Sequence, residues 1–152
     1  MIITPSSSKQ NKIKLIKLDW AYAETLAKPI RTNVFIKEQN VPEVEEWDDE
    51  DSSSLHIIAI KNGEAVATVR LTQAGKIGRM AVLKAHRKQG IGSTVLIELI
   101  KEAKQRGLKE IKLWSQTHAQ DFYKKHGFVV CGDEFLDAGI PHIEMRSIIV
   151  SP

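Results

Sequence analysis

A basic, glycine-rich stretch, HRKQGIGSTVLIELI (residues 86–100), constrains the fold of this chain most. It follows a strand-like segment at residues 76–82 and leads into a run whose apolar residues recur at helical spacing. Glycine inside a helix costs about 1 kcal/mol relative to alanine, so Gly90 and Gly92 at a helix start need another explanation. Two explanations are open: a tight strand-to-helix turn, or a ligand that approaches the backbone closely.

The rest of the chain predicts strands and helices arranged around this stretch. Pro29 is expected to separate two early helices, and Asn62-Gly63 predicts a tight hairpin. Strands are expected at 12–17, 55–60, 64–71, 76–82, 110–115, 128–131 and 142–150, and helices at 20–27, 31–39, 91–106 and 119–127. The predicted order is antiparallel hairpins, then strand–helix–strand–helix, then a final strand pair. This order predicts an α/β (or α+β) fold. We expect a mixed sheet of about six to seven strands with helices on both faces.

The length of 152 residues predicts one domain, at 12–152, after a polar, disordered lead-in at 1–11. No apolar run is long enough to cross a bilayer, and the first residues do not resemble a secretory leader. The single cysteine, Cys131, excludes an internal disulfide framework. We therefore expect a cytoplasmic protein without a membrane partner.

The charge of the chain is unevenly spread. The segment EVEEWDDED (residues 43–51) holds seven of the 19 acidic residues, which leaves 12 against 22 lysines and arginines, a net charge of +10, elsewhere. A basic body favours an anionic partner, and an acidic loop can hold a cation nearby. Taken alone, the acidic segment predicts a solvated loop.

The order of strand, basic glycine-rich loop and helix start forms a natural anion site. Backbone N–H groups in the first turn of a helix are unpaired, the helix dipole is positive there, and glycines let phosphate oxygens approach. The chain has no GxxxxGK[ST], and GIGSTV lacks the third glycine of the dinucleotide fingerprint. Arg87, Lys88 and the basic body favour a pyrophosphate ligand over a purely structural turn.

Two segments resemble those of the GNAT superfamily, the acyl-CoA-dependent N-acyltransferases. RKQGIG (residues 87–92) resembles the [Q/R]-x-x-G-x-[G/A] loop, which in that superfamily grips the pyrophosphate of coenzyme A. QTHAQDFYKKHGF (residues 116–128) is similar to its N-x-x-A-x-x-x-Y-x-x-x-G-F segment, with Gln116 in place of the usual asparagine. RTNVFIKEQNVPEVEEWDDED, GRMAVLKAHRKQGIGSTVL and DEFLDAGIPHIEM are similar to the small bacterial GNAT group often called YjcF-like or ElaA-like.

This resemblance implies the GNAT fold, in which a splayed pair of strands holds acyl-CoA. It also implies an N-acetyltransferase that moves an acetyl group from acetyl-CoA to a primary amine by direct attack on the thioester. A backbone amide of the strand before the cradle would stabilise the oxyanion, and the same strand would pair with the pantetheine arm. The residues implied in coenzyme A binding are Met80, Ala81, Val82, Arg87, Lys88, Gln89, Gly90, Ile91, Gly92, Ser93 and Gln116.

Tyr123 matches the position of the superfamily's general acid, which gives a proton to the departing thiolate. Without the motif, a tyrosine between Phe122 and Phe128 predicts only core packing. We expect Tyr123 to be catalytic because it is in register with the whole segment.

The general base is not assigned by the resemblance. Some group must take a proton from the acceptor, because an amine is largely protonated at neutral pH. Glu38 and His142 are candidates for the acceptor pocket or the base. The alternatives are that Glu38 pairs with Arg31 or Arg79, and that His142 makes a structural hydrogen bond. The acidic segment could orient a cationic acceptor or shield the pocket mouth.

Other classes of function find little support. The histidines lack HxxxH or HExxH spacing, so no metal site is expected. No basic stripe interleaved with aromatic residues indicates nucleic-acid binding. We expect a small-molecule or peptide amine as partner, no nucleic acid, and a monomer or homodimer. Two alternatives stay open: a catalytically silent acyl-CoA-binding sensor or adaptor of the same fold, and a basic nucleic-acid-binding module.

Overall fold

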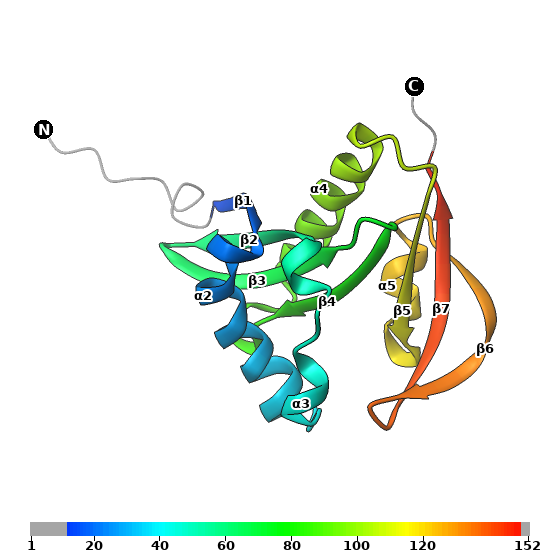
Figure 1. Ribbon diagram of the computed structural model, residues 1–152, viewed down its shortest axis with the longest axis horizontal. Coiled ribbons are helices and arrows are strands. Elements are labelled where there is room, and N and C mark those ends of the chain that lie inside the picture. The colour runs from blue at the N-terminus through cyan, green and yellow to red at the C-terminus, as the bar shows by residue number, and fades with distance from the viewer. Residues whose placement is uncertain (1–11, 150–152) are drawn as a thin grey trace, which may run out of the picture.

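The computed structural model describes residues 12–149 of the chain, which build one mixed sheet of seven strands (Figure 1). The strand order is β1-β2-β3-β4-β5-β7-β6. The strands are β1 (Ile13–Asp19), β2 (Leu55–Lys61), β3 (Glu64–Leu71), β4 (Lys76–Val82), β5 (Glu110–Gln116), β6 (Val129–Asp137) and β7 (Ile140–Ile148). The α-helices are α2 (Trp20–Arg31), α3 (Glu43–Glu46), α4 (Ile91–Gln105) and α5 (Gln120–Lys124). The predicted mixed sheet is confirmed, and the lead-in expected at 1–11 lies outside the described residues.

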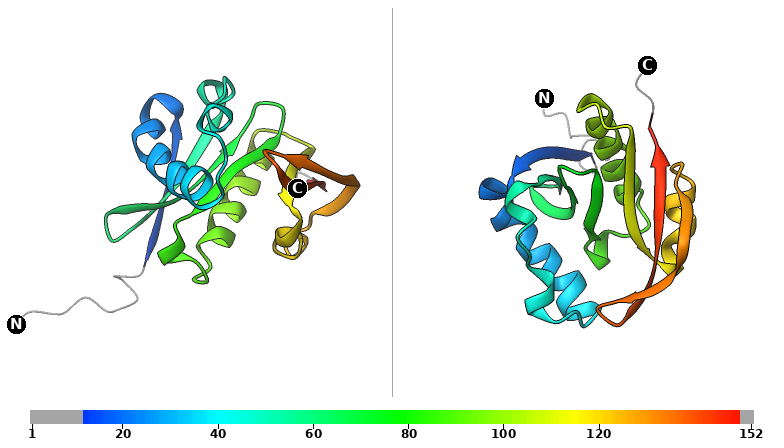
Figure 2. Two further views of the ribbon diagram at one scale, coloured as in Figure 1. Left: turned by 90° about the horizontal axis from the view of Figure 1, so that it is seen from below. Right: turned by 45° about the vertical axis from the view of Figure 1, so that its right-hand side comes forward.

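Helices cover both faces of the sheet, α2 on one face and α4 with α5 on the other (Figure 2). Strand β2 contributes buried side chains to both faces, because successive side chains of a strand point to opposite faces of the sheet. Leu55 and Ile57 belong to the main core under α4, whereas the ring of His56 packs at a tilt against Trp20 of α2. The apolar side of α4 that the sequence predicted, with Val95 among its buried residues, fills that main core.

The Asn62-Gly63 hairpin between β2 and β3 is confirmed. Both residues take left-handed backbone, with φ of +51° and +79°, which a two-residue turn of this kind requires. The antiparallel ladder continues from β1 through β4. Among the described residues, no helix is long and apolar enough to cross a membrane.

The expected break at Pro29 is wrong. Helix α2 runs through Pro29 to Arg31 and passes directly into a π-helix, Thr32–Glu38. The proline removes one backbone donor, but Ile30 and Arg31 are buried after it, and this packing holds the helix on the sheet. The wider π turns carry the chain to the edge of β4, where Val34 joins a small second core.

Strands β4 and β5 part soon after they meet. They are parallel and share only two register pairs, Lys76↔Lys112 and Ile77↔Leu113. A bulge follows on β4, where the register with β3 shifts and Arg79 takes a positive φ of +50°. The splayed strand pair that the resemblance implied is therefore present.

Strand β6 is longer than the strand predicted at 128–131, and β7 begins two residues before the strand predicted at 142–150. The two strands form a hairpin at the outer edge of the sheet (Figure 1). Most of β6 is exposed, so no alternation of apolar and polar residues marks it in the sequence. The hairpin turns at Ala138-Gly139, both at positive φ, next to the opening between β4 and β5. His142 is thus the third residue of β7 and not its first.

Candidate active site

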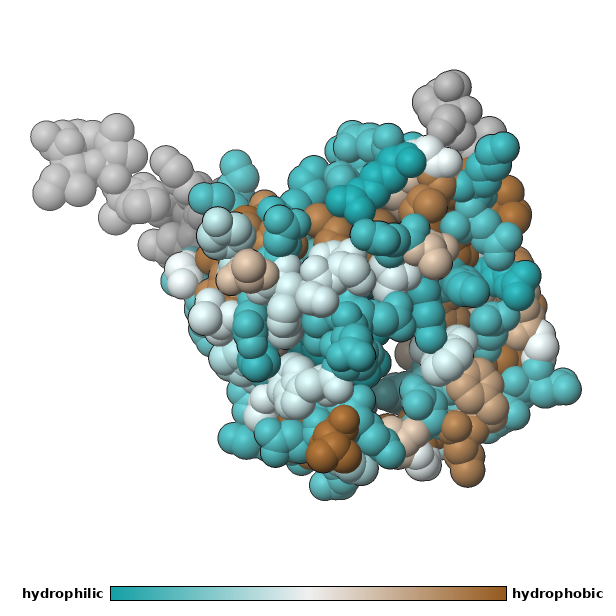
Figure 3. All heavy atoms as spheres, in the orientation of Figure 1, coloured by the Kyte–Doolittle hydropathy of each residue, from teal (hydrophilic) through white to brown (hydrophobic). Residues whose placement is uncertain are grey.

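Two cavities meet where β4 and β5 part. One, of about 440 Å³, is lined by residues of the acidic segment, β4, β5 and the β6–β7 hairpin, and we call it the acceptor cavity. The other, of about 530 Å³, lies over the start of α4, and we call it the cradle cavity. Gln39, Met80 and Ala119 line both. Figure 3 shows a hollow on the face of Figure 1, between the part built by α3 and β2–β4 and the part built by β5–β7.

Gly90 and Gly92 serve different purposes in the cradle cavity. Gly90 precedes α4 in left-handed backbone, with φ of +78°, which only glycine adopts at no steric cost. Gly92 has no such backbone, but a Cβ there would lie 3.5 Å from Phe122 and 3.6 Å from Met80. It therefore keeps open the gap between α4, α5 and β4. The first-turn amides of α4 border this gap and have no partner within the helix.

Arg87 is held in place by Glu38. Its Nη1 and Nη2 donate to the two carboxylate oxygens of Glu38 at 2.8 and 2.7 Å, and its Nε donates to the carbonyl of Val82 at 2.9 Å. The hydrogen bond from Arg87 lowers the pKa of Glu38. Glu38 does not line the acceptor cavity. Its partner is thus Arg87, not Arg31 or Arg79, and this ion pair joins the π-helix to the cradle.

The remaining predicted cradle residues surround the same gap. Met80, Ala81, Val82, Lys88, Ile91 and Ser93 all line the cradle cavity. Gln89 does not line it, and its side chain accepts a hydrogen bond from Lys61 at 2.5 Å. Ala81 and Val82 pair with β3 on one edge, while the edge towards β5 has no ladder partner among the described residues. An unpaired strand edge of this kind can accept an extended ligand.

Tyr123 lies at the inner side of the acceptor cavity. Its hydroxyl donates to the Sδ of Met80 at 3.7 Å, and its ring packs edge-on against Phe122 and Phe128. Burial raises the pKa of Tyr123 to about 12, so the phenol stays protonated across the physiological range. A thioether is a weak acceptor, which leaves the hydroxyl available to a better one.

Gln116 and His142 line the acceptor cavity from β5 and β7, where they are register partners. The amide of Gln116 donates to Gln39 Oε1 at 2.8 Å and so connects β5 to the end of the π-helix. His142 Nδ1 lies 2.7 Å from the carbonyl of Ile140. A carbonyl only accepts, so the neutral ring carries its proton on Nδ1 and has a free lone pair on Nε2.

The acidic segment at 43–51 is partly buried, so the expectation of a solvated loop is wrong for Glu46 and Asp51. These residues are 2% and 3% exposed, and both bind Arg31, which is 1% exposed. Arg31 Nε donates to Glu46 Oε2 at 2.7 Å, and its Nη1 donates to Asp51 Oδ1 at 2.8 Å. The charged segment is thus folded against α2.

Arg70 and Arg79 extend this cluster towards the acceptor cavity. Arg70 Nη1 lies 2.7 Å from Asp48 Oδ1, and Arg79 Nε lies 3.1 Å from Glu46 Oε2. Burial raises the pKa of Glu46, against the opposing effect of Arg79. Burial also disfavours the charge of Asp48, but the hydrogen bond and charge of Arg70 outweigh it and lower the pKa of Asp48.

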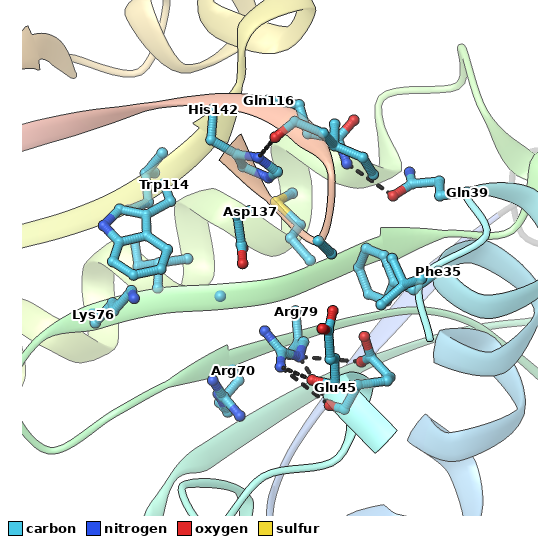
Figure 4. Close-up of a pocket in the computed structure, with 18 of the residues that line it drawn as sticks. Phe35, Gln39, Glu45, Arg70, Lys76, Arg79, Trp114, Gln116, Asp137 and His142 are labelled. Carbon is cyan, nitrogen blue, oxygen red and sulfur yellow. Dashed lines mark hydrogen bonds and ion pairs between the residues drawn. The ribbon is translucent and has the colours of Figure 1, made fainter. Parts of the chain in front are cut away.

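Several lining residues of the acceptor cavity were not predicted from the sequence. Lys76, Arg70 and Asp137 converge on it from different strands (Figure 4). Asp137 lies within a motif segment and Lys76 begins a predicted strand, but nothing in the sequence shows that strands far apart bring them together. Within residues 12–149, no group of three or more histidine, cysteine, aspartate or glutamate side chains is placed to hold a metal.

Comparison with known proteins agrees with this geometry. Residues 8–149 match the family described as "Acetyltransferase (GNAT) domain". The "Uncharacterized N-acetyltransferase YjcF" of Bacillus subtilis is 43% identical over 120 residues, which cover 76% of this chain and 86% of that protein. An acyl-CoA N-acyltransferase from Pseudomonas aeruginosa has a similar structure, with a TM-score of 0.81 and 29% identity over 90% of this chain and 99% of that one. The structure of Escherichia coli ElaA is also similar, with a TM-score of 0.82 and 26% sequence identity, and the match covers 90% of this chain and 99% of that one.

Proposed function

We propose that this chain, which belongs to the GNAT family of acetyltransferases, moves the acetyl group of acetyl-CoA to a primary amine. The amine attacks the thioester carbonyl directly. The observation that carries this proposal is the parting of β4 and β5 beside the start of α4, with Tyr123 in the opening. In the overall step an N–C bond forms, the C–S bond breaks, the amine loses a proton and the departing thiolate gains one.

The cradle suits a pyrophosphate. The first-turn amides of α4 and the positive end of its dipole face the cradle cavity, and Lys88 adds a positive charge. Arg87 is already paired with Glu38, so its role is to shape the loop. The free edge of β4 suits a pantetheine arm.

The thioester supplies an activated carbonyl, and the chain's own groups handle charge and protons. We assign the oxyanion donor to the backbone at Met80–Val82, on the unpaired edge of β4. Tyr123 is placed to donate a hydrogen bond to the departing sulfur. An ordinary thiol has a pKa of about 8.5, so full proton transfer from a phenol of pKa about 12 is uphill by about 5 kcal/mol. The first contribution of Tyr123 is therefore a hydrogen bond to the departing sulfur. Proton transfer from Tyr123 becomes more favourable where burial in the site also raises the pKa of the thiol.

His142 is the proposed base, directly or through a water. Its Nε2 lone pair is available because Nδ1 is engaged with the carbonyl of Ile140, and the ring lines the acceptor cavity. Glu38 is not assigned this role, because Arg87 stabilises its charged form and it lies outside that cavity.

The test is thiol release from acetyl-CoA across a panel of amines that includes amino sugars, polyamines, amino acids and peptide lysines. A Cys131→Ser variant is run beside the wild type, because Cys131 is a free thiol that adds background. Amine-dependent release, with N-acetylated product found by mass spectrometry, is the expected result. Tight acetyl-CoA binding without transfer to any amine would contradict the proposal and favour a silent acyl-CoA sensor.

A further inference from the structure

The acceptor cavity is lined by more carboxylates than cationic side chains. The carboxylates are those of Glu45, Glu46, Asp48, Glu50 and Asp137. The cationic side chains are those of Arg70, Lys76 and Arg79. Five carboxylates against three cations leave two negative charges in excess. Arg31 and Asp51 do not line the cavity and pair with each other, so they do not change this excess. A cavity with such an excess attracts cations and repels anions.

The cations of the lining are already engaged by protein groups. Arg79 Nη2 donates to Asp48 Oδ2 at 3.2 Å, and Arg70 Nη1 donates to Asp48 Oδ1 at 2.7 Å. Lys76 Nζ lies 3.1 Å from the centroid of the Trp114 ring. An anionic acceptor would therefore compete with existing contacts and meet the excess of carboxylates.

Three carboxylates of the lining are not engaged in this way. Asp137, Glu45 and Glu50 form no ion pair with any residue from 12 to 149. Burial lowers the pKa of Lys76, while Glu50 and Asp137 act to raise it, so both carboxylates lie near Lys76 without pairing with it. Asp137 is half-buried and enters the cavity from the β6–β7 hairpin, facing the side that carries Glu45 and Arg79 (Figure 4).

The register of the hairpin places Asp137 close to the proposed base. Asp137 pairs with Ile140 across the two-residue turn Ala138-Gly139, and His142 lies two residues beyond Ile140. Side chains two residues apart on a strand point to the same face. Asp137 and His142 are therefore diagonal neighbours on one face, with Cα atoms roughly 7–8 Å apart.

His142 gives an independent reason to expect a ligand beside Asp137. It is 8% exposed and lines the acceptor cavity, and only its Nδ1 has a hydrogen-bond partner in the described part of the chain. Its Nε2 is then an acceptor without a donor, and a buried polar atom left unpaired is costly. A protonated amine supplies that donor. The face thus offers two places for positively charged nitrogen, one at His142 and one at Asp137.

We propose that the acceptor is a diamine or polyamine, whose reacting amine lies beside His142 and Tyr123 while a second ammonium binds Asp137. Two positive charges match the excess of two carboxylates, whereas an aminocarboxylate would add a third negative charge. The reacting ammonium gives a proton to His142 before attack, and the second ammonium keeps its charge. The diagonal separation suits two nitrogens joined by about three to five methylene groups. This inference rests on the proposed acetyl transfer.

The acidic segment then has one of the two roles that its sequence left open. Glu45 and Glu50 are exposed and line the same cavity, so they add to the attraction for a cationic acceptor. Attraction between exposed charges weakens as salt is added.

The test compares acceptors of matched length, namely diaminobutane, butylamine and aminobutanoate, together with diamines of two to six carbons. At saturating acetyl-CoA and low salt, kcat/KM of the best diamine should exceed that of its matched monoamine at least tenfold. Asp137→Asn should lower this ratio at least fivefold, mainly through KM for the diamine. Asparagine is common in turns, so the hairpin should still fold. Asp133→Asn is the matched control and should keep the ratio, because Asp133 is exposed on β6 and does not line the cavity.

Calorimetry with coenzyme A present, but without an acetyl group to transfer, separates this inference from the proposed function. Binding of a diamine that Asp137→Asn weakens at least fivefold supports the subsite even if no acetyl transfer occurs. Transfer that favours butylamine or aminobutanoate over every diamine overturns the subsite while the transferase assignment stands. A diamine preference that Asp137→Asn and Asp133→Asn leave equally intact also overturns it, as does the absence of both diamine binding and diamine preference.

Discussion

Tyr123 shows how one environment sets both the stability and the reactivity of a side chain. The same burial that packs its ring against Phe122 and Phe128 raises its pKa to about 12 and removes strong acceptors from its hydroxyl. The phenol is therefore a retained proton donor beside Met80, a residue that lines both cavities.

Replacing Tyr123 by phenylalanine removes only the hydroxyl. Turnover should fall by about 10²-fold, the lower end of what a positioned proton donor contributes. The dissociation constant of coenzyme A should change little, since Tyr123 does not line the cradle cavity. Steady-state kinetics together with calorimetry check both expectations. Unchanged turnover would remove Tyr123 from the mechanism.

The raised pKa of Tyr123 also predicts a pH-dependent stability. The unfolded phenol titrates near 10 and the folded one near 12, so the stabilisation is complete below pH 10 and is lost as the pH rises towards 12. A shift of two units corresponds to at most about 2–3 kcal/mol. Urea unfolding gives the free energy of unfolding of the wild type and of Tyr123→Phe. The difference between these two free energies should become smaller by up to about 2–3 kcal/mol between pH 10 and pH 12. A constant difference would show that the folded phenol titrates normally.

Some residues of the site could be predicted from sequence and others could not, for a physical reason. The segment from Arg87 to Ser93 is local, so its contribution to the cradle follows from spacing and backbone chemistry. The partner of Glu38 and the surroundings of Lys76 depend on contacts between distant strands, which no local pattern contains. The burial of Glu46 could not be predicted from the sequence either, because its partner Arg31 lies on a different element.

Helix α4 is the element that combines the two sequence signals, a glycine-rich start and an apolar side. Gly90 fixes the entry of the chain, and Gly92 fixes the width of the gap to α5. In contrast, the π-helix after α2 could not be predicted, because Pro29 indicates a helix end and only tertiary packing carries the helix past it.

Substitutions at Gly92 should separate helix stability from ligand access. Alanine places a Cβ at ordinary contact distance from Phe122 and Met80, so the fold should be retained. Valine adds two methyl groups that close the gap. We expect coenzyme A binding to weaken at least tenfold in Gly92→Val and to stay within about threefold in Gly92→Ala, where tenfold is about 1.4 kcal/mol. Calorimetry with both variants measures this, and equal affinity in Gly92→Val would contradict the cradle.

At the scale of the whole molecule, the buried charge cluster fastens the acidic segment to α2 and to the sheet. Arg31 is its centre and contacts two carboxylates that are nearly inaccessible to water. Removal of one partner of a buried ion pair leaves an uncompensated charge, which costs about 3–5 kcal/mol.

Arg31→Met should therefore lower the free energy of unfolding by about that amount. Lys28→Met is the matched control, because Lys28 forms an exposed ion pair with Glu24 that is worth well under 1 kcal/mol. Chemical denaturation of both variants gives the comparison. A loss below 1 kcal/mol in Arg31→Met would show that the cluster is not a source of stability.

The parting of β4 and β5 also bears on the cooperativity of the fold. The sheet consists of two halves, β1–β4 and β5–β7–β6, whose only ladder contact in the described chain is two residue pairs. A pantetheine arm on the free edge would act as a missing strand, so backbone amides of residues 78–82 that face the opening should exchange with deuterium quickly in the free protein and slowly with coenzyme A. At a ligand concentration 100 times its dissociation constant, the stability gained is about 2.7 kcal/mol. The protein would then complete its sheet with its own substrate, and its resistance to proteolysis would follow the supply of acetyl-CoA.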